Sequence, residues 1–300
     1  MLKPAHIKAG DRIRIVSPAG RVIKEKVLPA VELLQQAGFE VILGKHVFDT
    51  HFQFAGTDEQ RLQDFQDAMD DTDCKVIICS RGGYGVIRIA DKLNFSAFRK
   101  NPKWLIGFSD ITALHALFQQ EGFTSIHGAM PAFYLKEKQP TESFTELMKV
   151  LKGEKTTVQV PANEFNRPGK AKGQLIGGNL SILYSLLGTS FEPETDGKIL
   201  FIEDLSEYLY HIDRIMHSLK LSGKLKNLKG LIVGSFTEMK DNDSPFGQSV
   251  PEIIFNAVKE YNYPVCFDFP AGHIDRNLPL LFGADYSLFV EAKRASIDMK

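Results

Sequence analysis

The sequence predicts a two-domain α/β protein whose first domain contains a parallel sheet with flanking helices. Three observations support this prediction. The chain of 300 residues is long enough for two domains that each bury a core. Short apolar runs alternate with segments whose apolar residues recur at helical spacing. Periodicity is lost over residues 161–172, so we expect an N-terminal domain over 1–160, a linker over 161–172 and a C-terminal domain over 173–300.

The N-terminal domain begins with a βαβ unit. A strand that ends in a turn over residues 12–19, a helix over 28–38 with Gly38 past its end, and a strand over 40–43 follow one another at the spacing of such a unit. Because the crossover of this unit is right-handed and its strands are parallel, we expect a flavodoxin- or Rossmann-like sheet. The other elements predicted here are helices over 58–70, 86–93, 111–118 and 141–150, strands over 75–79 and 104–106, and a strand and turn over 124–130.

The second half of the chain again combines strands and helices. The predicted elements are a strand, glycine turn and helix over 173–183, strands over 198–204 and 230–236, and helices over 205–221 and 249–261. The spacing of Asp204 and Glu207 fits a capping box at the start of the helix over 205–221. Residues 280–300 are expected to form short strands and turns that complete the C-terminal domain.

The composition excludes several classes of protein. Hydrophobic residues make up 43% and charged residues 24% of the chain, as in an ordinary soluble globular protein. A formal net charge of -1 gives no electrostatic reason to expect a nucleic-acid or anionic-membrane partner. We find no apolar leader at the N-terminus and no run of membrane-spanning length, and therefore expect a cytoplasmic protein. The three cysteines form neither a metal-ligand pattern nor a disulfide framework, and we expect no metal and no cofactor.

Ser109 lies where the hydrophobic period changes from strand to helix. Asp110 fits the N-cap position of that helix and Gly122 its C′ position. A serine at this corner lies beside unpaired backbone N–H groups, as an acyl-transfer nucleophile requires. The segment has Gly107 as the first glycine of a G-x-S-x-G elbow but Ile111 in place of the second. A plain helix cap is the alternative interpretation.

A glycine-rich loop, Ser80-Arg81-Gly82-Gly83-Tyr84-Gly85, follows the apolar strand over 75–79. Two functional roles are possible for its backbone N–H groups: they could bind a phosphate, or they could form one half of an oxyanion hole. The structural alternative is that the glycines only permit a tight turn. The absence of G-x-G-x-x-G and of a P-loop lysine argues against phosphate. Because ligands bind beyond the carboxyl ends of parallel strands, we expect this loop and residues 107–110 to be neighbours.

Two more strand ends carry titratable side chains. Glu203 is the carboxylate at the end of an otherwise apolar strand, which is costly unless a partner is present. His273 follows a strand, in a loop rich in glycine and proline, where a surface histidine is the plain alternative. Hydrolases of the serine type need a hydroxyl, a base and a carboxylate that orients the base. Ser109, Glu203 and His273 supply these three groups.

The chain resembles the LD-carboxypeptidases, also called muramoyltetrapeptide carboxypeptidases, a serine peptidase family to which the microcin-immunity peptidases are related. The resemblance covers nearly the whole chain. It is carried by these segments, in this order: Val16-Ser17-Pro18-Ala19, Ser80 to Gly85, Gly107-Phe108-Ser109-Asp110, Gly177-Gly178-Asn179-Leu180, Ile202-Glu203-Asp204 and Gly272-His273. It implies an N-terminal α/β domain and a smaller, β-rich C-terminal domain.

The resemblance also implies roles for individual residues. Ser109 is expected to be the nucleophile, His273 the general base and Glu203 the residue that orients it, while the N–H groups of Gly83 and Asp110 form the oxyanion hole. The implied reaction is hydrolysis of the L,D peptide bond that releases the terminal D-alanine from a muropeptide tetrapeptide. It belongs to cell-wall recycling in the cytoplasm, and the resemblance suggests a homodimer.

Two rival functions remain open at the level of sequence. A microcin-type amidase acting on aminoacyl-nucleotide conjugates would need a stacking aromatic, for which Phe246 is a candidate. A non-catalytic two-domain ligand-binding protein would leave the serine, glutamate and histidine without a common role. A carboxypeptidase must bind the free terminal carboxylate, and Arg81 and Arg276 are the candidate residues for this. For each arginine a solvent-facing or structural role is the alternative.

Overall fold

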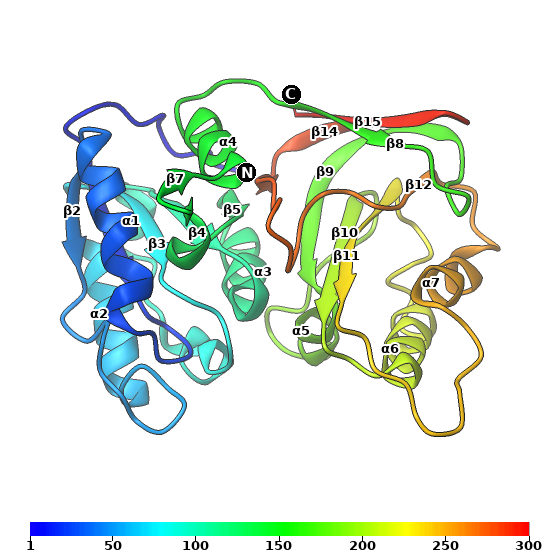
Figure 1. The fold of residues 1–300 in the computed structure, drawn as a ribbon, viewed down its shortest axis with the longest axis horizontal. Helices are drawn as coiled ribbons and strands as arrows, with labels where there is room; N and C mark the ends of the chain where they lie inside the picture. Colours follow the sequence, from blue (N-terminus) through cyan, green and yellow to red (C-terminus); the bar gives the residue numbers. More distant parts are fainter. Residues whose placement is uncertain (300) are drawn as a thin grey trace. The chain divides into compact units, whose positions relative to one another are not determined.

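The computed structural model describes residues 1–299 and divides the chain into two compact units (Figure 1). Unit 1 comprises Met1–Glu154 and Leu278–Leu281, and unit 2 comprises Lys155–Asn277 and the chain from Phe282 on. The α/β class and the two-part organisation predicted from the sequence are confirmed.

Unit 1 contains a six-stranded sheet in the order β13-β5-β4-β3-β1-β2, in which the pairs from β2 through β5 are all parallel. Its strands are β1 (Arg12–Val16), β2 (Glu40–Leu43), β3 (Cys74–Cys79), β4 (Trp104–Gly107), β5 (Ser125–His127) and β13 (Leu280–Phe282). Its helices are α1 (Lys24–Gln36), α2 (Asp58–Asp70), α3 (Thr112–Gln120) and α4 (Glu142–Leu151). A small hairpin joins β6 (Leu135–Lys136) to β7 (Gln139–Pro140). The predicted parallel sheet is therefore present.

Unit 2 contains a seven-stranded mixed sheet in the order β12-β11-β10-β9-β14-β15-β8. Strands β9 to β12 pair in parallel, whereas β14, β15 and β8 are antiparallel to their neighbours. Its strands are β8 (Thr157–Pro161), β9 (Gly169–Asn179), β10 (Ile199–Leu205), β11 (Gly230–Thr237), β12 (Val265–Cys266), β14 (Asp285–Val290) and β15 (Arg294–Met299). Its helices are α5 (Leu180–Ser185), α6 (Leu209–Leu221) and α7 (Val250–Val258).

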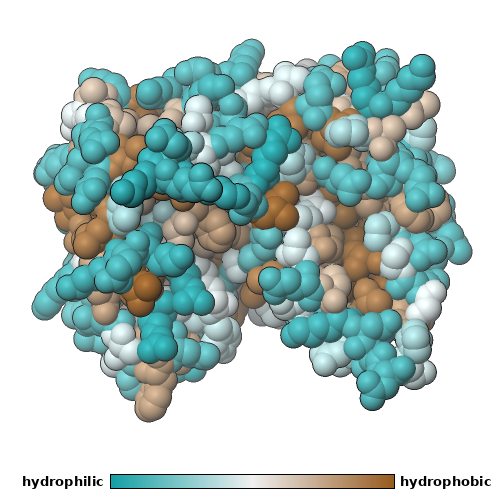
Figure 2. Space-filling model, viewed as in Figure 1, coloured by the Kyte–Doolittle hydropathy of each residue, from teal (hydrophilic) through white to brown (hydrophobic). Residues whose placement is uncertain are grey.

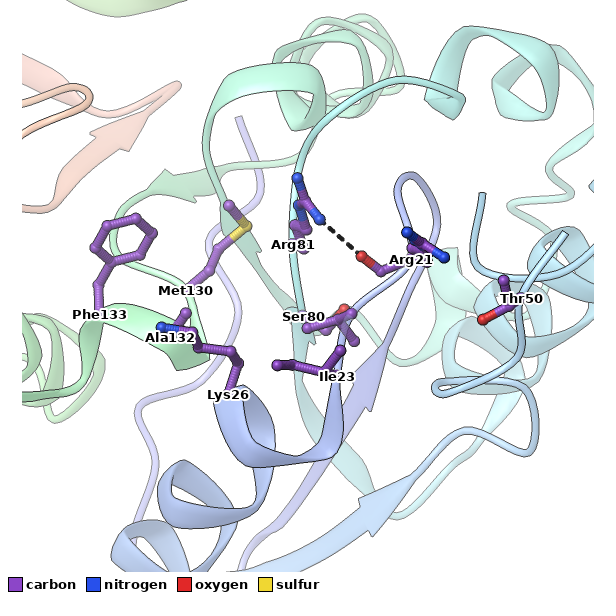
Figure 3. A pocket seen from close by; sticks show the side chains of 10 residues that line it. Arg21, Ile23, Lys26, Thr50, Ser80, Arg81, Met130, Ala132 and Phe133 are labelled. Carbon is purple, nitrogen blue, oxygen red and sulfur yellow. Dashed lines mark hydrogen bonds between the residues drawn. The ribbon is translucent and has the colours of Figure 1, made fainter. Parts of the chain in front are cut away.

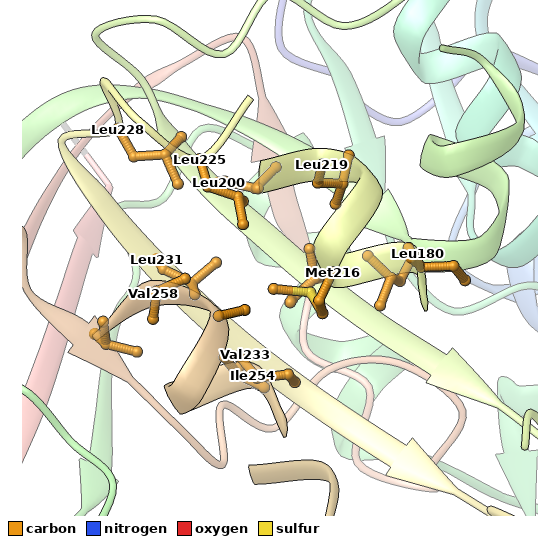
Figure 4. Packing of buried hydrophobic residues seen from close by; sticks show 14 of the residues in the cluster. Leu180, Leu200, Met216, Leu219, Leu225, Leu228, Leu231, Val233, Ile254 and Val258 are labelled. Carbon is orange, nitrogen blue, oxygen red and sulfur yellow. The ribbon is translucent and has the colours of Figure 1, made fainter. Parts of the chain in front are cut away.

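The core of unit 2 lies between the parallel strands and the helices α5, α6 and α7 (Figure 4). Leu200 and Leu231 come from neighbouring strands, and Met216 and Ile254 come from the helices that cover them. All four side chains are at most 3% exposed. The helices thus bury one face of the sheet, as the apolar runs of these strands require.

The predicted linker differs from the observed structure. The two units divide at Glu154, and residues 161–172 include the end of β8 and the start of β9. The outer strand β8 has only Val160 fully buried, which is why its periodicity is weak. In β9, Ala171 is buried between the exposed Lys170 and Lys172, an alternation too short to be recognised from the sequence.

The helix predicted over 86–93 is replaced by two 3₁₀ turns, Val86–Arg88 and Ala90–Lys92. Ile89 separates them with φ −123° and ψ −15°, which interrupts a continuous helix. The predicted glycine turn at 177–178 is also wrong, because β9 continues through both glycines to Asn179 and pairs with β10 there. A Cβ on Gly177 would lie 1.9 Å from the carbonyl oxygen of Phe201, so the glycine permits the close approach of β10.

Hydrophilic residues predominate on the face of the molecule that Figure 2 shows, with hydrophobic residues interspersed. A few large hydrophobic side chains are well exposed, among them Phe52 at 82% and Ile23 at 59%. Within residues 1–299, no helix combines the length and the hydropathy that crossing a membrane would need.

Candidate active site

Ser109 lies on a sharp turn between β4 and α3 of unit 1. Its φ is +64°, a left-handed conformation that costs a non-glycine residue on the order of 1 kcal/mol or more. Phe108 before it is extended, and residues Ser109–Ile111 form a 3₁₀ turn that leads into the helix. The Ser109 side chain is only partly buried. A partly exposed serine on a strained strand-to-helix turn is the geometry of a nucleophile elbow.

Gly107 allows this turn to form. A Cβ on Gly107 would lie 2.8 Å from Cγ1 of Ile111, so the isoleucine occupies the space that a side chain at 107 would need. The elbow thus keeps its first glycine and packs Ile111 against it, which explains how the second glycine can be absent. The carbonyl oxygen of Gly107 accepts the N–H of Gly128 at 3.1 Å.

His115 supports the same carbonyl from the helix. Its Nε2 lies 2.9 Å from the oxygen of Gly107, and its Nδ1 lies 2.8 Å from Oγ of Ser125. Because a carbonyl can only accept, Nε2 carries the proton and Nδ1 accepts from the serine hydroxyl. Burial lowers the pKa of His115 to about 4, so this histidine is neutral near pH 7. It is a structural support of the elbow that the sequence did not single out.

The glycine-rich loop passes directly beside Ser109. A Cβ on Gly82 would lie 2.9 Å from Cβ and 3.1 Å from Oγ of Ser109. The loop and the elbow are therefore neighbours, as predicted. Gly83 has φ +107°, and among the described residues none accepts a hydrogen bond from its N–H. That N–H is available to a bound group.

Asp110 differs from its predicted role as a helix cap. The carboxylate is 2% exposed and its Oδ2 accepts the N–H of Val86 at 2.9 Å, at the end of the glycine-rich loop. Burial raises the pKa of Asp110 to about 6, which the hydrogen bond from Val86 opposes. The side chain acts on a distant segment because the turn at Ser109 directs it inward, away from the first turn of α3.

Arg61 anchors the end of the glycine-rich loop through hydrogen bonds to backbone carbonyl groups. This fully buried guanidinium donates from Nη1 to the carbonyl oxygens of Pro18 at 2.6 Å and Gly85 at 2.9 Å, and it pairs with Asp58. The sequence placed it on a polar helix and gave no sign that it is buried. Arg61 and Asp110 together fix the C-terminal end of this loop, at Gly85 and Val86. The loop as a whole lies beside the nucleophile elbow.

In unit 2, Glu203 and His273 form a hydrogen-bonded pair. Glu203 lies in β10, is completely buried, and its Oε2 is 2.7 Å from Nδ1 of His273. Burial raises the pKa of Glu203, and the hydrogen bond from His273 opposes the rise. The histidine is the partner that a carboxylate at this strand end requires. Its Nε2 is the ring nitrogen directed away from Glu203.

The loop around His273 is fixed by the neighbouring strand β11. The N–H of Ser235 donates to the carbonyl oxygen of Ala271 at 2.9 Å, and the N–H of Gly272 donates to Oδ1 of Asn277 at 3.0 Å. Gly272 has φ +118°, and a Cβ there would lie 2.9 Å from Oε2 of Glu203. Only glycine at 272 therefore permits the close approach of His273 to the carboxylate.

Asp204 does not cap the helix as predicted. β10 continues to Leu205 and α6 begins at Leu209. The carboxylate of Asp204 instead accepts from Nδ2 of Asn179 at 2.9 Å and from the N–H of Ser181 at 2.9 Å. Asp204 therefore has a structural role, as expected, but the helix that it stabilises is α5 and not the helix that follows it in the sequence.

The two arginines proposed to bind carboxylate lie in different units. Arg81 of unit 1 is exposed, donates from Nη1 to the carbonyl oxygen of Arg21 at 2.8 Å, and lines a cavity of about 610 Å³ (Figure 3). Arg276 of unit 2 is exposed in the loop of His273. Phe246 is half-buried against the core of unit 2.

The described part of the chain, residues 1–299, contains no group of three or more histidine, cysteine or carboxylate side chains arranged to hold a metal ion. The three cysteines are free and buried, and burial raises the pKa of Cys79 above its usual value.

An elbow serine beside a glycine-rich loop, and a histidine hydrogen-bonded to a buried carboxylate, are the kinds of group that serine hydrolases on α/β scaffolds use. Comparison with known proteins gives the family. Residues 13–128 match the LD-carboxypeptidase N-terminal domain, and residues 172–288 match the LD-carboxypeptidase C-terminal domain. The chain belongs to the LD-carboxypeptidase family of serine peptidases. The resemblance stated from the sequence is confirmed, and the family is one of enzymes rather than of non-catalytic binding proteins.

The chain is similar to several named members over almost its full length. It is 35% identical over 301 residues to the probable murein peptide carboxypeptidase of Bacillus subtilis (strain 168), covering 99% of this chain and 94% of that protein. It is 27% identical over 333 residues to the microcin C7 self-immunity protein of Escherichia coli, covering 99% and 95%. The crystal structure of muramoyltetrapeptide carboxypeptidase from Oxalobacter formigenes superposes with a TM-score of 0.87 at 28% identity, covering 96% and 98%.

Proposed function

We propose that this protein hydrolyses the L,D peptide bond that releases the terminal D-alanine from murein tetrapeptides, using Ser109, His273 and Glu203 as a catalytic triad. The names of the relatives from Bacillus subtilis and Oxalobacter formigenes support a murein peptide as substrate. The observation that carries the proposal is the hydrogen bond of 2.7 Å between Nδ1 of His273 and the buried carboxylate of Glu203, because this is how a triad carboxylate orients its histidine.

In the first half of the reaction, Oγ of Ser109 attacks the carbonyl carbon of the scissile bond while Nε2 of His273 takes its proton. The N–H groups of Gly83 and Asp110 donate to the oxyanion of the tetrahedral intermediate. The intermediate collapses by breaking the C–N bond. D-alanine leaves with the proton from His273, and the shortened peptide remains as an ester on Ser109.

In the second half, His273 removes a proton from water, and the resulting hydroxide attacks the ester carbonyl. The second intermediate collapses, and Ser109 recovers its proton from His273 as the peptide acid leaves. Glu203 accepts the Nδ1–H of His273 throughout. It fixes the tautomer and stabilises the imidazolium that forms twice in each cycle.

The experiment combines a fluorophosphonate probe with alanine variants at the three positions. We expect the probe to label the native enzyme but neither Ser109→Ala nor His273→Ala. Tetrapeptide cleavage should fall on the order of 10⁴-fold or more for these variants, and less for Glu203→Ala. Asp204→Asn is the matched control for removing a buried carboxylate from the same strand. A fully active Glu203→Ala enzyme would exclude Glu203 from the triad.

A comparison of free-acid and amidated tetrapeptides separates the carboxypeptidase from the amidase alternative. A carboxypeptidase should prefer the free acid through a cationic anchor, for which Arg81 and Arg276 are proposed. Equal cleavage of both substrates would favour the amidase. Phe246, the aromatic considered for stacking on a nucleotide, does not add support to the amidase because it packs against the core of unit 2.

The proposed setting is cell-wall recycling in the cytoplasm, and the proposed assembly is a homodimer. Both follow from the family resemblance. Light scattering during gel filtration tests the assembly, since a homodimer has twice the chain mass of 33.6 kDa.

A further inference from the structure

We propose that the cavity of unit 1 shown in Figure 3 is the subsite for the amino acid that leaves, with the positive charges of Arg21, Lys26 and Arg81 attracting its carboxylate and an apolar wall binding its side chain. This inference rests on the proposed function and deepens it. The proposed binding site for the carboxylate is a cationic, partly apolar pocket rather than a single arginine. A pocket of this kind should accept more terminal D-amino acids than D-alanine alone.

The cavity adjoins the nucleophile within unit 1. Arg81 lines it, and the next residue is Gly82, whose Cβ position is 2.9 Å from Cβ of Ser109. On the other side, the ring of Phe133 lines the cavity and lies 5.6 Å from the ring of Phe108, the residue before Ser109. Two parts of the wall are therefore close to the elbow, although Ser109 itself does not line the cavity. We infer that a peptide with its scissile bond at Ser109 can place its last residue in this cavity.

The polar part of the wall is cationic. Arg21, Lys26 and Arg81 line the cavity, and none of its lining residues is acidic. Among the described residues, no carboxylate lies within 4 Å of the charged nitrogens of these three side chains. Nη1 of Arg81 is held by the carbonyl oxygen of Arg21, which fixes its guanidinium at the cavity (Figure 3). Figure 3 shows the charged ends of these side chains spread around the cavity, so together they give its wall a positive potential that favours an anion such as a carboxylate.

The rest of the wall is apolar and unusually exposed. Ile23 is 59% and Phe133 is 37% exposed, although both are large hydrophobic residues, and Met130 and Ala132 also line the cavity (Figure 3). The volume of about 610 Å³ falls in the range of about 300–1,000 Å³ typical of small-molecule sites. The methyl group of D-alanine fills only a small part of it. We therefore expect D-leucine and other larger apolar residues to be accepted at the terminus.

The test of the charge uses the double variant Arg21→Ala/Lys26→Ala with Lys24→Ala as control. Lys24 lies on the same helix and carries the same charge, but it does not line the cavity and instead lies over the ring of Phe48. We expect kcat/KM for the free-acid tetrapeptide to fall about tenfold or more in the double variant, because it removes two of the three positive charges that attract the carboxylate. The amidated tetrapeptide should be cleaved as by the native enzyme, and Lys24→Ala should change neither rate.

The test of the size uses tetrapeptides that end in D-alanine or D-leucine and the variant Ala132→Phe. Ala132 is exposed on the cavity wall, so a larger side chain there fills the cavity without disturbing the core. The native enzyme should cleave both peptides at rates within about tenfold of each other, and Ala132→Phe should slow the D-leucine peptide selectively by about tenfold. Thermal unfolding of each variant checks that the fold is retained.

Three results would overturn the inference. The double variant could slow free-acid and amidated peptides equally, or Ala132→Phe could slow both terminal residues equally, or Arg276→Ala alone could abolish the preference for the free acid. The last result would place carboxylate recognition in unit 2. These failures leave the proposed reaction intact. A native enzyme that cleaves none of the tetrapeptides contradicts the proposed function, and the subsite is refuted with it.

Discussion

Replacing Asp110 by asparagine should make the stability of unit 1 depend less on pH. The carboxylate is 2% exposed and accepts the N–H of Val86 at 2.9 Å, so an ionised group is held in a buried position beneath the glycine-rich loop. Burial raises the pKa of Asp110 from its ordinary value of 3.8 to about 6. Asparagine has the same shape and retains an oxygen that accepts the Val86 N–H, but it carries no charge.

The magnitude follows from the difference between the two pKa values of Asp110. A raised folded-state pKa means that the folded protein binds this proton more tightly than the unfolded chain does. The contribution to stability is present below pH 3.8 and is lost as the pH rises through about 6. A shift of about 2 units corresponds to about 3 kcal/mol. The free energy of unfolding of Asp110→Asn minus that of the native protein should therefore increase by up to about 3 kcal/mol between pH 4 and pH 8.

The assay is urea unfolding at several pH values, followed by tryptophan fluorescence. Trp104 is the only tryptophan of the chain and lies fully buried in β4, so its fluorescence reports on unit 1. Any constant cost of packing the amide cancels when the stability difference is compared between pH values. Asp91→Asn, the same substitution at an exposed carboxylate, is the control. A stability difference that stays flat from pH 4 to pH 8 for Asp110→Asn would refute the reasoning.

Three further predictions concern the elbow and the expectation that catalysis requires no metal. Gly107→Ala should destabilise unit 1 by about 1–3 kcal/mol and lower activity, because its Cβ would lie 2.8 Å from Ile111. Adding Ile111→Ala should restore part of the stability in the same urea assay. Burial lowers the pKa of His115 to about 4, so the stability it contributes is present above pH 6.5 and lost as the pH falls through about 4. Acid titration of Trp104 fluorescence should show a weaker loss over that window in His115→Gln. Dialysis against a chelator should leave the rate of tetrapeptide cleavage unchanged, whereas complete loss restored by zinc would contradict the serine mechanism.

Local chemistry in the sequence determined most helices, most strands and the position of the elbow. The helix α2 spans Asp58–Asp70 as predicted, and Gly122 follows the end of α3 with a left-handed φ of +88°. Such features depend on residues a few positions apart, so periodicity and capping preferences suffice to find them. The motifs containing Ser109, Glu203 and His273 also indicated the family from the sequence alone.

Only the tertiary structure decided which partners the buried polar side chains take. Asp110 and Asp204 look like helix caps in the sequence, yet they accept hydrogen bonds from Val86 and Ser181, each more than 20 positions away. Glu203 meets a histidine 70 positions away because β11 holds the loop that carries it. A buried polar atom must find a partner wherever the fold brings one, and sequence spacing contains no information about that distance. The cavity of Figure 3 depends on the same kind of long-range placement, since its cations come from separate segments around β1, α1 and β3.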